Sequence, residues 1–197
     1  MKQLLERYPA LKAVETSLGE AIALTVETYR RGNKVLLCGN GGSAADCEHI
    51  AGEFLKGFLS SRTVKDGRVP EDLAVRMQGS LPAIPLTSFS AAMTASLNDL
   101  DPEVVYAQLL YGFAKEGDLL IAISTSGNAK NVCNAARLAK SIGVNVVSLT
   151  GEGGGALAKL ATVAICAPAT ETYRVQEYHL PIYHHLCAAV ERALFEN

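Results

Sequence analysis

The sequence predicts an α/β fold, a three-layer αβα sandwich in which helices cover both faces of a five-stranded parallel sheet, with an added N-terminal helix. Short apolar runs alternate with longer segments of helical periodicity, an order typical of crossovers between parallel strands. The apolar runs are also nearly continuous, as in strands that are buried on both faces. Such a sheet has either the flavodoxin-like or the Rossmann-like arrangement.

Each expected element follows from a local pattern. The apolar runs predict strands at residues 34–38, 81–86, 119–124, 144–150 and 161–167. Helical spacing and terminating glycines predict helices at residues 4–31, where Pro9 can break the helix, and at 43–58, 88–98, 102–115, 128–142, 153–160 and 173–195. Residues 60–80 are polar, charged and glycine-containing, and we expect a long loop there that is partly helical around residues 70–77.

The chain length of 197 residues indicates one domain, with residues 1–31 as a helical extension and residues 32–197 as the αβα core. A net charge of −2 without a basic segment excludes nucleic-acid binding through a basic surface. No apolar run approaches the roughly 18 residues of a membrane-spanning helix, and the N-terminus does not read as a signal peptide. The 5 cysteines lack metal-ligand spacing and lie on apolar segments, which indicates reduced thiols and a cytoplasmic location.

Two polar loops follow expected strands, at the edge of the sheet where ligands bind in this class of fold. The glycine loop, Gly39-Asn-Gly-Gly-Ser43, joins a strand to a helix, and its backbone N–H groups can approach an anion closely. The hydroxyl loop, Ser124-Thr-Ser-Gly-Asn128, supplies three hydroxyl groups between another strand and helix. Together they predict a phosphate site, although the hydroxyl loop alone fits a helix cap and turn equally well.

The glycine loop fits neither of two common phosphate motifs. No lysine follows the glycines as in a P-loop, and Ala44 stands at the third glycine position of the dinucleotide-binding fingerprint. The further glycine-rich stretch Glu152-Gly-Gly-Gly155 is interpreted as a flexible turn rather than a site.

Candidate acid, base or metal ligands lie on two of the expected helices. His49 and Glu53 are four residues apart and therefore share a helix face, as a metal-binding pair, an acid/base pair or a surface ion pair. The closing helix carries Gln176 and three of the four histidines, among them His184. Gln176 and His184 differ by about 80° and about 12 Å along a straight helix. They can share one metal only if it lies between them, if Pro181 kinks the helix, or if they come from different subunits.

Taken together, these motifs resemble those of a known protein family. The chain resembles the sugar isomerase (SIS) domain family over about residues 32–191. The matching motifs are Cys-Gly-Asn-Gly-Gly-Ser at 38–43, His-x-x-x-Glu at 49–53, Asn98-Asp99, Ile-Ser-Thr-Ser-Gly-Asn at 123–128, Leu-Thr-Gly at 149–151, and Arg-x-Gln-Glu-x-His at 174–179 with His184. The branch that it resembles isomerises sedoheptulose 7-phosphate to an aldose, D-glycero-D-manno-heptose 7-phosphate, through an enediol.

The resemblance also implies roles for residues of this chain. It implies that the sugar phosphate is held by Asn40, Gly41, Gly42, Ser43, Asp99, Ser124, Thr125, Ser126 and Gln176. It implies one Zn²⁺ per subunit on His49, Glu53, Gln176 and His184, with Glu53 and His184 as the acid/base pair. A homotetramer with its active sites at subunit interfaces is implied as well, with the N-terminal helices in its central bundle.

Two alternatives remain open. One is a non-catalytic SIS module of the kind that binds the bacterial replication initiator or senses sugar phosphates, but such modules lose the acid/base residues that this chain retains. The other is an isomerase of a different ketose phosphate. Departures from the family pattern at Lys56-Gly57, at Ala129 and in the longer 60–80 loop leave the distal end of the substrate open.

Overall fold

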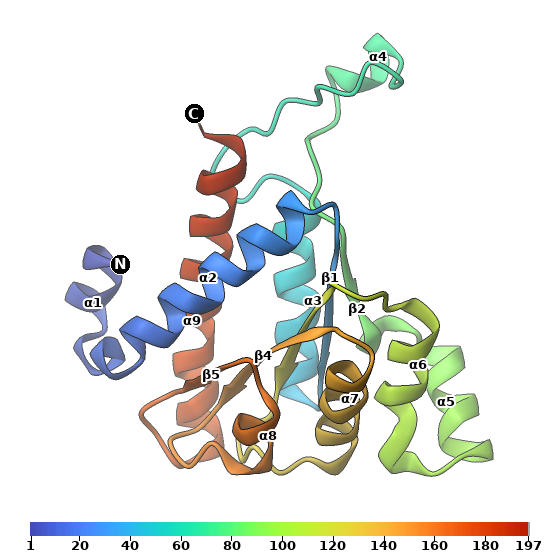
Figure 1. Ribbon diagram of the computed structural model, residues 1–197. Coiled ribbons are helices and arrows are strands. Elements are labelled where there is room, and N and C mark those ends of the chain that lie inside the picture. The colour runs from blue at the N-terminus through green and yellow to red at the C-terminus, as the bar shows by residue number, and fades with distance from the viewer. Residues whose placement is uncertain (197) are drawn as a thin grey trace.

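One sheet of five parallel strands forms the centre of the computed structural model, which describes residues 1–196 (Figure 1). The strands are β1 (Val35–Gly39), β2 (Ala83–Pro85), β3 (Leu119–Ile123), β4 (Asn145–Thr150) and β5 (Val163–Cys166). Their order is β2-β1-β3-β4-β5, and all four pairings are parallel. The predicted parallel sheet is confirmed, and this order is the flavodoxin-like one of the two arrangements.

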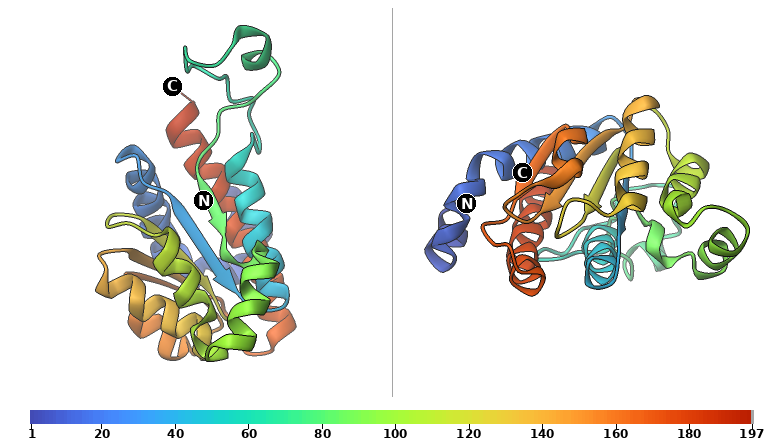
Figure 2. Two further views of the ribbon diagram at one scale, coloured as in Figure 1. Left: turned by 90° about the vertical axis from the view of Figure 1, so that its right-hand side faces the viewer. Right: turned by 90° about the horizontal axis from the view of Figure 1, so that it is seen from below.

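Helices cover both faces of the sheet, which confirms the three-layer sandwich (Figure 2). One face packs against α2 (Glu15–Arg30), α3 (Gly42–Leu55) and α9 (Thr172–Phe195). The other packs against α6 (Val105–Phe113), α7 (Lys130–Ser141) and α8 (Gly155–Leu160). Side chains alternate along each strand, so that Val35 and Leu37 enter the first core and Leu36 enters the second.

The N-terminal segment begins with α1 (Lys2–Arg7), which is followed by a 3₁₀ turn, η1 (Pro9–Val14), and then by α2. The predicted break at Pro9 is confirmed, because proline lacks the N–H that would continue α1. Leu18 and Ala21 of α2 are fully buried in the same core as the strands. Residues 15–30 are therefore part of one helical layer, and α1 alone extends beyond it (Figure 1).

Most of residues 60–80 project from the body of the molecule as an arm that carries one short helix, α4 (Glu71–Ala74) (Figures 1 and 2). A partly helical loop in this region is confirmed. The remaining elements are η2 (Leu86–Ser88), α5 (Ser90–Asp99) and η3 (Pro102–Val104). Within residues 1–196 there is no helix whose length and apolar character would suit a bilayer crossing.

Some predicted boundaries are wrong. β2 has only three residues because it is an edge strand that follows Pro82 and ends at Pro85, and proline cannot donate to a ladder. α3 ends at Leu55 rather than at residue 58. α7 begins at Lys130 rather than at residue 128, since hydrogen bonds of the hydroxyl loop hold residues 124–129 in turns.

Candidate active site

The glycine loop and the hydroxyl loop are neighbours, as predicted. They leave the carboxyl ends of β1 and β3, which are adjacent in the sheet and pair Gly39 with Ile123. Asn40 of the glycine loop exchanges two hydrogen bonds with Asn131 of α7, at 2.9 and 3.0 Å. The side-chain bonds therefore hold the first loop against the helix that follows the second.

Each glycine of the first loop has a structural reason. Gly41 has a φ of 58°, a left-handed conformation that L side chains rarely adopt. A Cβ at Gly39 would lie 2.9 Å from the Cβ of Ser43. At Gly42, a Cβ would lie only 2.3 Å from Nε2 of Gln176, so the amide of Gln176 packs directly onto the start of α3. The loop is a tight cradle that a larger side chain would fill.

The serines of the second loop bond to their own backbone in this structure. Oγ of Ser124 accepts the N–H of Ala129 at 3.4 Å, and Oγ of Ser126 accepts the N–H of Asn128 at 3.2 Å. The hydroxyl loop therefore does form a turn with serine-to-backbone hydrogen bonds before α7, as the alternative interpretation predicts. A hydroxyl that accepts one bond can still donate its proton, so both serines keep a donor for a phosphate oxygen.

The glycine-rich turn at residues 152–155 packs against the hydroxyl loop. The N–H of Leu157 donates to the carbonyl of Gly127 at 2.9 Å. A Cβ at Gly127 would lie 2.1 Å from the carbonyl oxygen of Gly154. The glycines here permit close backbone packing behind the hydroxyl loop, a use of glycine that the sequence does not distinguish from flexibility.

α3 and α9 lie side by side and bring the candidate catalytic groups together. Nε2 of His49 lies 3.2 Å from Oε1 of Glu53 and 3.4 Å from Nε2 of His184. The imidazole rings of His49 and His184 meet edge to face, with centroids 4.9 Å apart. The structure therefore brings three of the four predicted zinc ligands together, with His49 in contact with both Glu53 and His184.

Two other predicted site residues lie elsewhere. Gln176 packs against Gly42 at the start of α3, about 12 Å along a straight α9 from His184. Asp99 ends α5 on the exposed surface, and the one hydrogen bond found for its carboxylate within the described chain comes from Asn98, at 2.7 Å. Within a single chain, the side chain of Gln176 therefore contacts the glycine loop and not the histidines.

His179 of α9 does not belong to this cluster. Its ring is fully buried, and Nε2 lies 3.2 Å from the carbonyl oxygen of Thr150. Burial lowers the pKa of His179 to about 4, only partly offset by the bond to Thr150, so the ring is neutral in the folded protein. His179 therefore connects α9 to the end of β4.

Sequence reasoning missed two residues that orient His49. The hydroxyl of Tyr183 lies 3.0 Å from Nδ1 of His49 and donates to Oδ1 of Asp46 at 3.2 Å. Because the single hydroxyl proton goes to Asp46, the hydroxyl oxygen of Tyr183 can accept an N–H bond from Nδ1 of His49, an arrangement that directs Nε2 toward Glu53 and His184. Burial raises the pKa of Tyr183, and nearby Asp46 adds to the shift, so its hydroxyl stays protonated.

A buried ion pair, also missed, closes the end of α3 next to Glu53. Arg62 and Glu191 are 1% exposed, and Nε of Arg62 lies 2.7 Å from Oε1 of Glu191. The guanidinium also donates to the carbonyl oxygens of Glu53 and Phe54, at 2.8 and 2.6 Å. The Glu191 carboxylate accepts the N–H groups of residues 58, 59 and 60. This pair satisfies the free carbonyls of the helix on which Glu53 lies.

Histidine nitrogens and a carboxylate oxygen are donors that Zn²⁺ prefers. Zinc–ligand bonds of about 2.0–2.1 Å put tetrahedral donors roughly 3.3–3.4 Å apart, which matches the two distances made by His49. Oε2 of Glu53 is buried without a hydrogen-bond partner within residues 1–196. Among residues 1–196, no group of three or more His, Cys, Asp or Glu side chains is already arranged around a space for a metal ion. The donor types and spacing therefore fit the metal, and side-chain rotation has to open its centre.

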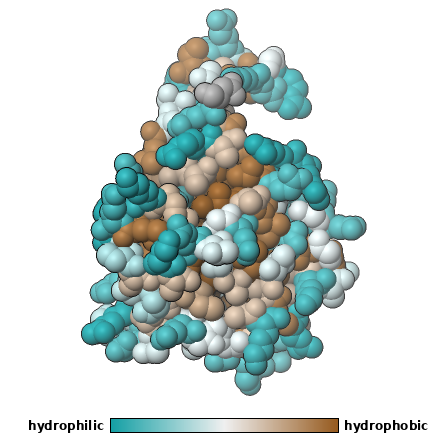
Figure 3. Space-filling view, turned by 60° about the vertical axis from the view of Figure 1, so that its left-hand side comes forward, coloured by the Kyte–Doolittle hydropathy of each residue, from teal (hydrophilic) through white to brown (hydrophobic). Residues whose placement is uncertain are grey.

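His184 faces a groove of about 850 Å³ between α1 and α9, which Phe58 and Pro181 also line. Burial, together with nearby His49, lowers the pKa of His184, and this favours the neutral ring. Figure 3 shows apolar surface, bordered by polar side chains, on the side of the molecule that carries α1 and α2. The groove between α1 and α9 gives the histidine cluster an open approach.

Comparison with known proteins places this geometry in a family. The family model described as SIS domain matches residues 1–151. The chain belongs to the SIS domain family. It is 42% identical to the phosphoheptose isomerase of Aneurinibacillus thermoaerophilus over 172 residues, which are 87% of this chain and 79% of that protein. It is 40% identical to the phosphoheptose isomerase of Roseiflexus sp. (strain RS-1) over 189 residues, 94% of this chain and 88% of that one.

A solved structure agrees. The phosphoheptose isomerase of Neisseria gonorrhoeae superposes with a TM-score of 0.79 at 30% identity, over 96% of this chain and 94% of that chain. The two chains are therefore similar in structure over nearly their whole lengths. The expected SIS fold is therefore confirmed along the chain.

Proposed function

We propose that this SIS protein is a phosphoheptose isomerase, which converts sedoheptulose 7-phosphate to D-glycero-D-manno-heptose 7-phosphate, a step toward nucleotide-activated heptose. The observation that carries the proposal is the contact that His49 makes with Glu53, on the helix that begins at the glycine loop, and with His184 of α9. Full-length similarity to proteins named phosphoheptose isomerase supports it. The retained acid/base residues argue against a non-catalytic SIS module.

The two loops would anchor the phosphate. Ser43, Ser124 and Ser126 offer hydroxyl donors, and the first turn of α3 adds the positive end of its dipole. His49 follows Gly42 by seven residues, about 10 Å along the helix. A ligand held by its phosphate at the loops can therefore extend along α3 toward the histidine cluster.

Isomerisation requires one proton to move between neighbouring carbons. Glu53 removes the proton beside the carbonyl and so forms the enediol, then returns a proton to the adjacent carbon. Its Oε2 has no competing hydrogen bond in the described chain and is free to accept. His184, kept neutral by its surroundings, can exchange the hydroxyl proton of the substrate. Tyr183 and Asp46 hold the ring of His49 in the orientation that this requires.

Zinc is part of the proposal. His49, Glu53 and His184 would hold it, and Gln176 would join from the first turns of α9 or from another subunit. When bound, the ion supplies a Lewis acid that polarises the carbonyl oxygen and stabilises the negative charge that develops there. The bond between Tyr183 and Nδ1 of His49 supports this role, because ligating histidines ordinarily have such a partner on the other nitrogen.

We further propose a cytoplasmic homotetramer with active sites at subunit interfaces. The groove beside His184 supports it, because α1 and α9 leave apolar side chains open there. Leu180 is 41% exposed and Leu59 is 68% exposed. Apolar surface of this kind, next to a candidate site, suits burial by another copy of the chain.

The direct test is incubation of the purified protein with sedoheptulose 7-phosphate, with and without a chelator, followed by separation and detection of the aldose. We expect conversion by the metal-loaded protein and loss of conversion after chelation, restored by added Zn²⁺. Conversion that persists after complete metal removal would contradict the role of zinc. A metal-loaded tetramer that converts no sedoheptulose 7-phosphate would refute the proposed activity, and other ketose phosphates would then be tested.

A further inference from the structure

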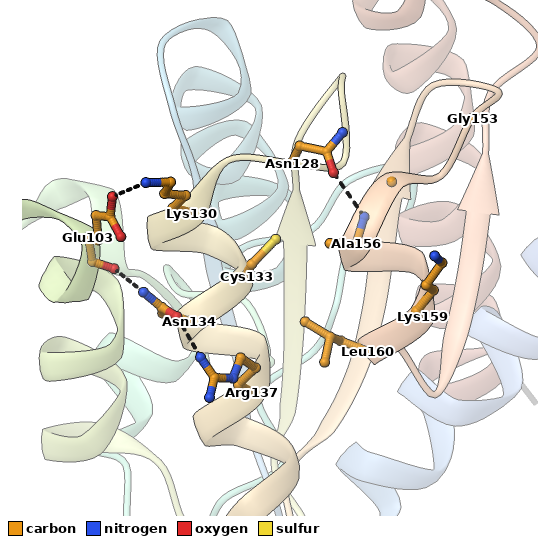
Figure 4. Close-up of a pocket in the computed structure, with 11 residues that line it drawn as sticks. Glu103, Asn128, Lys130, Cys133, Asn134, Arg137, Gly153, Ala156, Lys159 and Leu160 are labelled. Atoms are coloured by element: carbon orange, nitrogen blue, oxygen red, sulfur yellow. Dashed lines mark hydrogen bonds and ion pairs between the residues drawn. The ribbon is translucent and has the colours of Figure 1, made fainter.

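A second cavity lies on the other face of the sheet from His49, Glu53 and His184, between α7 and α8. Its volume is about 750 Å³, within the range usual for small-molecule sites. Figure 4 shows Cys133 of α7 and Ala156 and Leu160 of α8 along its walls. The cavity therefore combines apolar surface with enough space for a ligand larger than a simple ion.

The charge of this cavity is strongly positive for a chain whose net charge is −2. Lys130, Arg137 and Lys159 line it, with Glu103 as the one acidic residue, which gives three positive charges against one negative. Nζ of Lys130 lies 2.6 Å from Oε1 of Glu103, so that pair is neutral. Arg137 and Lys159 make no ion pair within the described chain. Two uncompensated cations, one on each helix, thus face the same cavity.

The polar contacts around Arg137 leave it available to a ligand. Its only side-chain hydrogen bond within residues 1–196 goes to Oδ1 of Asn134, at 3.3 Å (Figure 4). A guanidinium has five N–H donors in a planar fork that suits phosphate oxygens. The neighbouring methyl groups of Leu160 cannot pair with charge and instead favour an apolar or aromatic group. The cavity is therefore suited to a molecule that carries both features.

The top of the cavity is shared with the hydroxyl loop. Asn128 lines it, and its Oδ1 accepts the N–H of Ala156 at 3.0 Å (Figure 4). The same side chain donates from Nδ2 to the carbonyl oxygen of Ser126 at 3.0 Å. A ligand that displaces Asn128 would change the position of Ser126, whereas one that packs against it would fix the loop.

We propose that this cavity binds an organic phosphate that carries an apolar or aromatic group, the chemical class of the nucleotides. The phosphate would lie between Arg137 and Lys159, and the apolar group against Leu160 and Ala156. Through Asn128, occupancy would change the affinity of the hydroxyl loop for its own phosphate. This coupling rests on the proposed function, whereas binding in the cavity does not.

Isothermal titration calorimetry of the full chain with four probes tests the proposal: ADP, adenosine, ribose 5-phosphate and inorganic phosphate. We expect ADP to bind most tightly, since it alone combines the charge and the ring, and to bind more weakly at high salt. The double variant R137A/K159A should weaken ADP binding by roughly tenfold or more, as expected when two charged contacts are lost. The control variant K140A, an exposed lysine of α7 that follows Arg137 by three residues but does not line the cavity, should bind ADP as the wild type does.

Several results would overturn the proposal. ADP binding that is absent, or that is unchanged in R137A/K159A, would show that the cavity is not the site. Inorganic phosphate that binds as tightly as ADP would exclude the apolar subsite. A changed oligomeric state of R137A/K159A by sedimentation would identify the cavity as a subunit interface instead. None of these measurements depends on turnover, so they are separate from the test of the isomerase activity.

Discussion

Replacing Arg62 by methionine removes the charge that neutralises buried Glu191 and keeps the apolar stem of the side chain. The guanidinium makes three hydrogen bonds, to Glu191 at 2.7 Å and to the carbonyls of Phe54 and Glu53 at 2.6 and 2.8 Å. The variant leaves the Glu191 carboxylate without its cation and the Glu53 carbonyl without this donor, whereas the Phe54 carbonyl keeps the bond that it accepts from the N–H of Leu81 at 2.9 Å. Removing one partner of a fully buried pair costs about 3–5 kcal/mol of the free energy of unfolding. We expect a loss in that range.

Urea unfolding followed by circular dichroism measures this loss, and R68M supplies a matched control. Arg68 also pairs with a carboxylate, that of Asp66 at 2.6 Å, but its side chain is 90% exposed. R68M should therefore unfold at nearly the same urea concentration as the wild type. An R62M variant that loses no more stability than R68M would refute the reasoning that the buried pair stabilises the end of α3.

Acid adds a second test of the same pair. Burial alone would raise the pKa of Glu191, but the N–H groups of residues 58 and 59 and the guanidinium of Arg62 outweigh it, and the pKa lies below its usual value. A carboxyl with a depressed pKa contributes stability above its unfolded pKa of about 4.3, and this contribution is lost as the pH falls further. The stability of R62M should accordingly depend less on pH below about 4.3 than that of the wild type.

Three further outcomes are expected. The free energy of unfolding should fall by up to about 3 kcal/mol between pH 6.5 and pH 4, because the pKa of His179 is about 4 in the folded protein and about 6.5 in the unfolded chain. The urea midpoint of H179Q should change less with pH than that of the wild type, and an equal change in both proteins would contradict this. G42A should weaken sugar-phosphate binding with little loss of stability, since its Cβ displaces the flexible end of Gln176; an unchanged KM would refute the cradle. Y183F should lower kcat by roughly 10–100-fold, because His49 loses its orienting partner, and an unaltered kcat would exclude that role.

Much of the fold could be predicted because its signals are local. The apolar runs at β1, β3, β4 and β5 correspond to buried strands, and Pro9 ends α1 where proline must. Boundaries failed where a tertiary contact decides them. The serine hydroxyls hold residues 124–129 in turns and delay α7, an effect that depends on the folded loop and not on propensity.

In the candidate site, too, local contacts could be predicted from the sequence and long-range contacts could not. His49 and Glu53 meet because they are four residues apart on one helix, but the contact with His184 depends on how α9 packs against α3. Arg62 and Glu191 were missed because they are 129 residues apart and match no motif. Gln176 was predicted from resemblance both to hold the sugar phosphate and to bind zinc, and the structure places its side chain against Gly42 of the glycine loop.

The central claim is that Glu53 carries out proton transfer on a sugar phosphate held by the two loops. The most direct measurement compares E53Q with E48Q, a control on the exposed side of α3, for conversion of sedoheptulose 7-phosphate and for its binding by calorimetry. We predict that E53Q binds the substrate and converts none of it, whereas E48Q converts it at the wild-type rate. Conversion by E53Q at close to the wild-type rate would contradict the account.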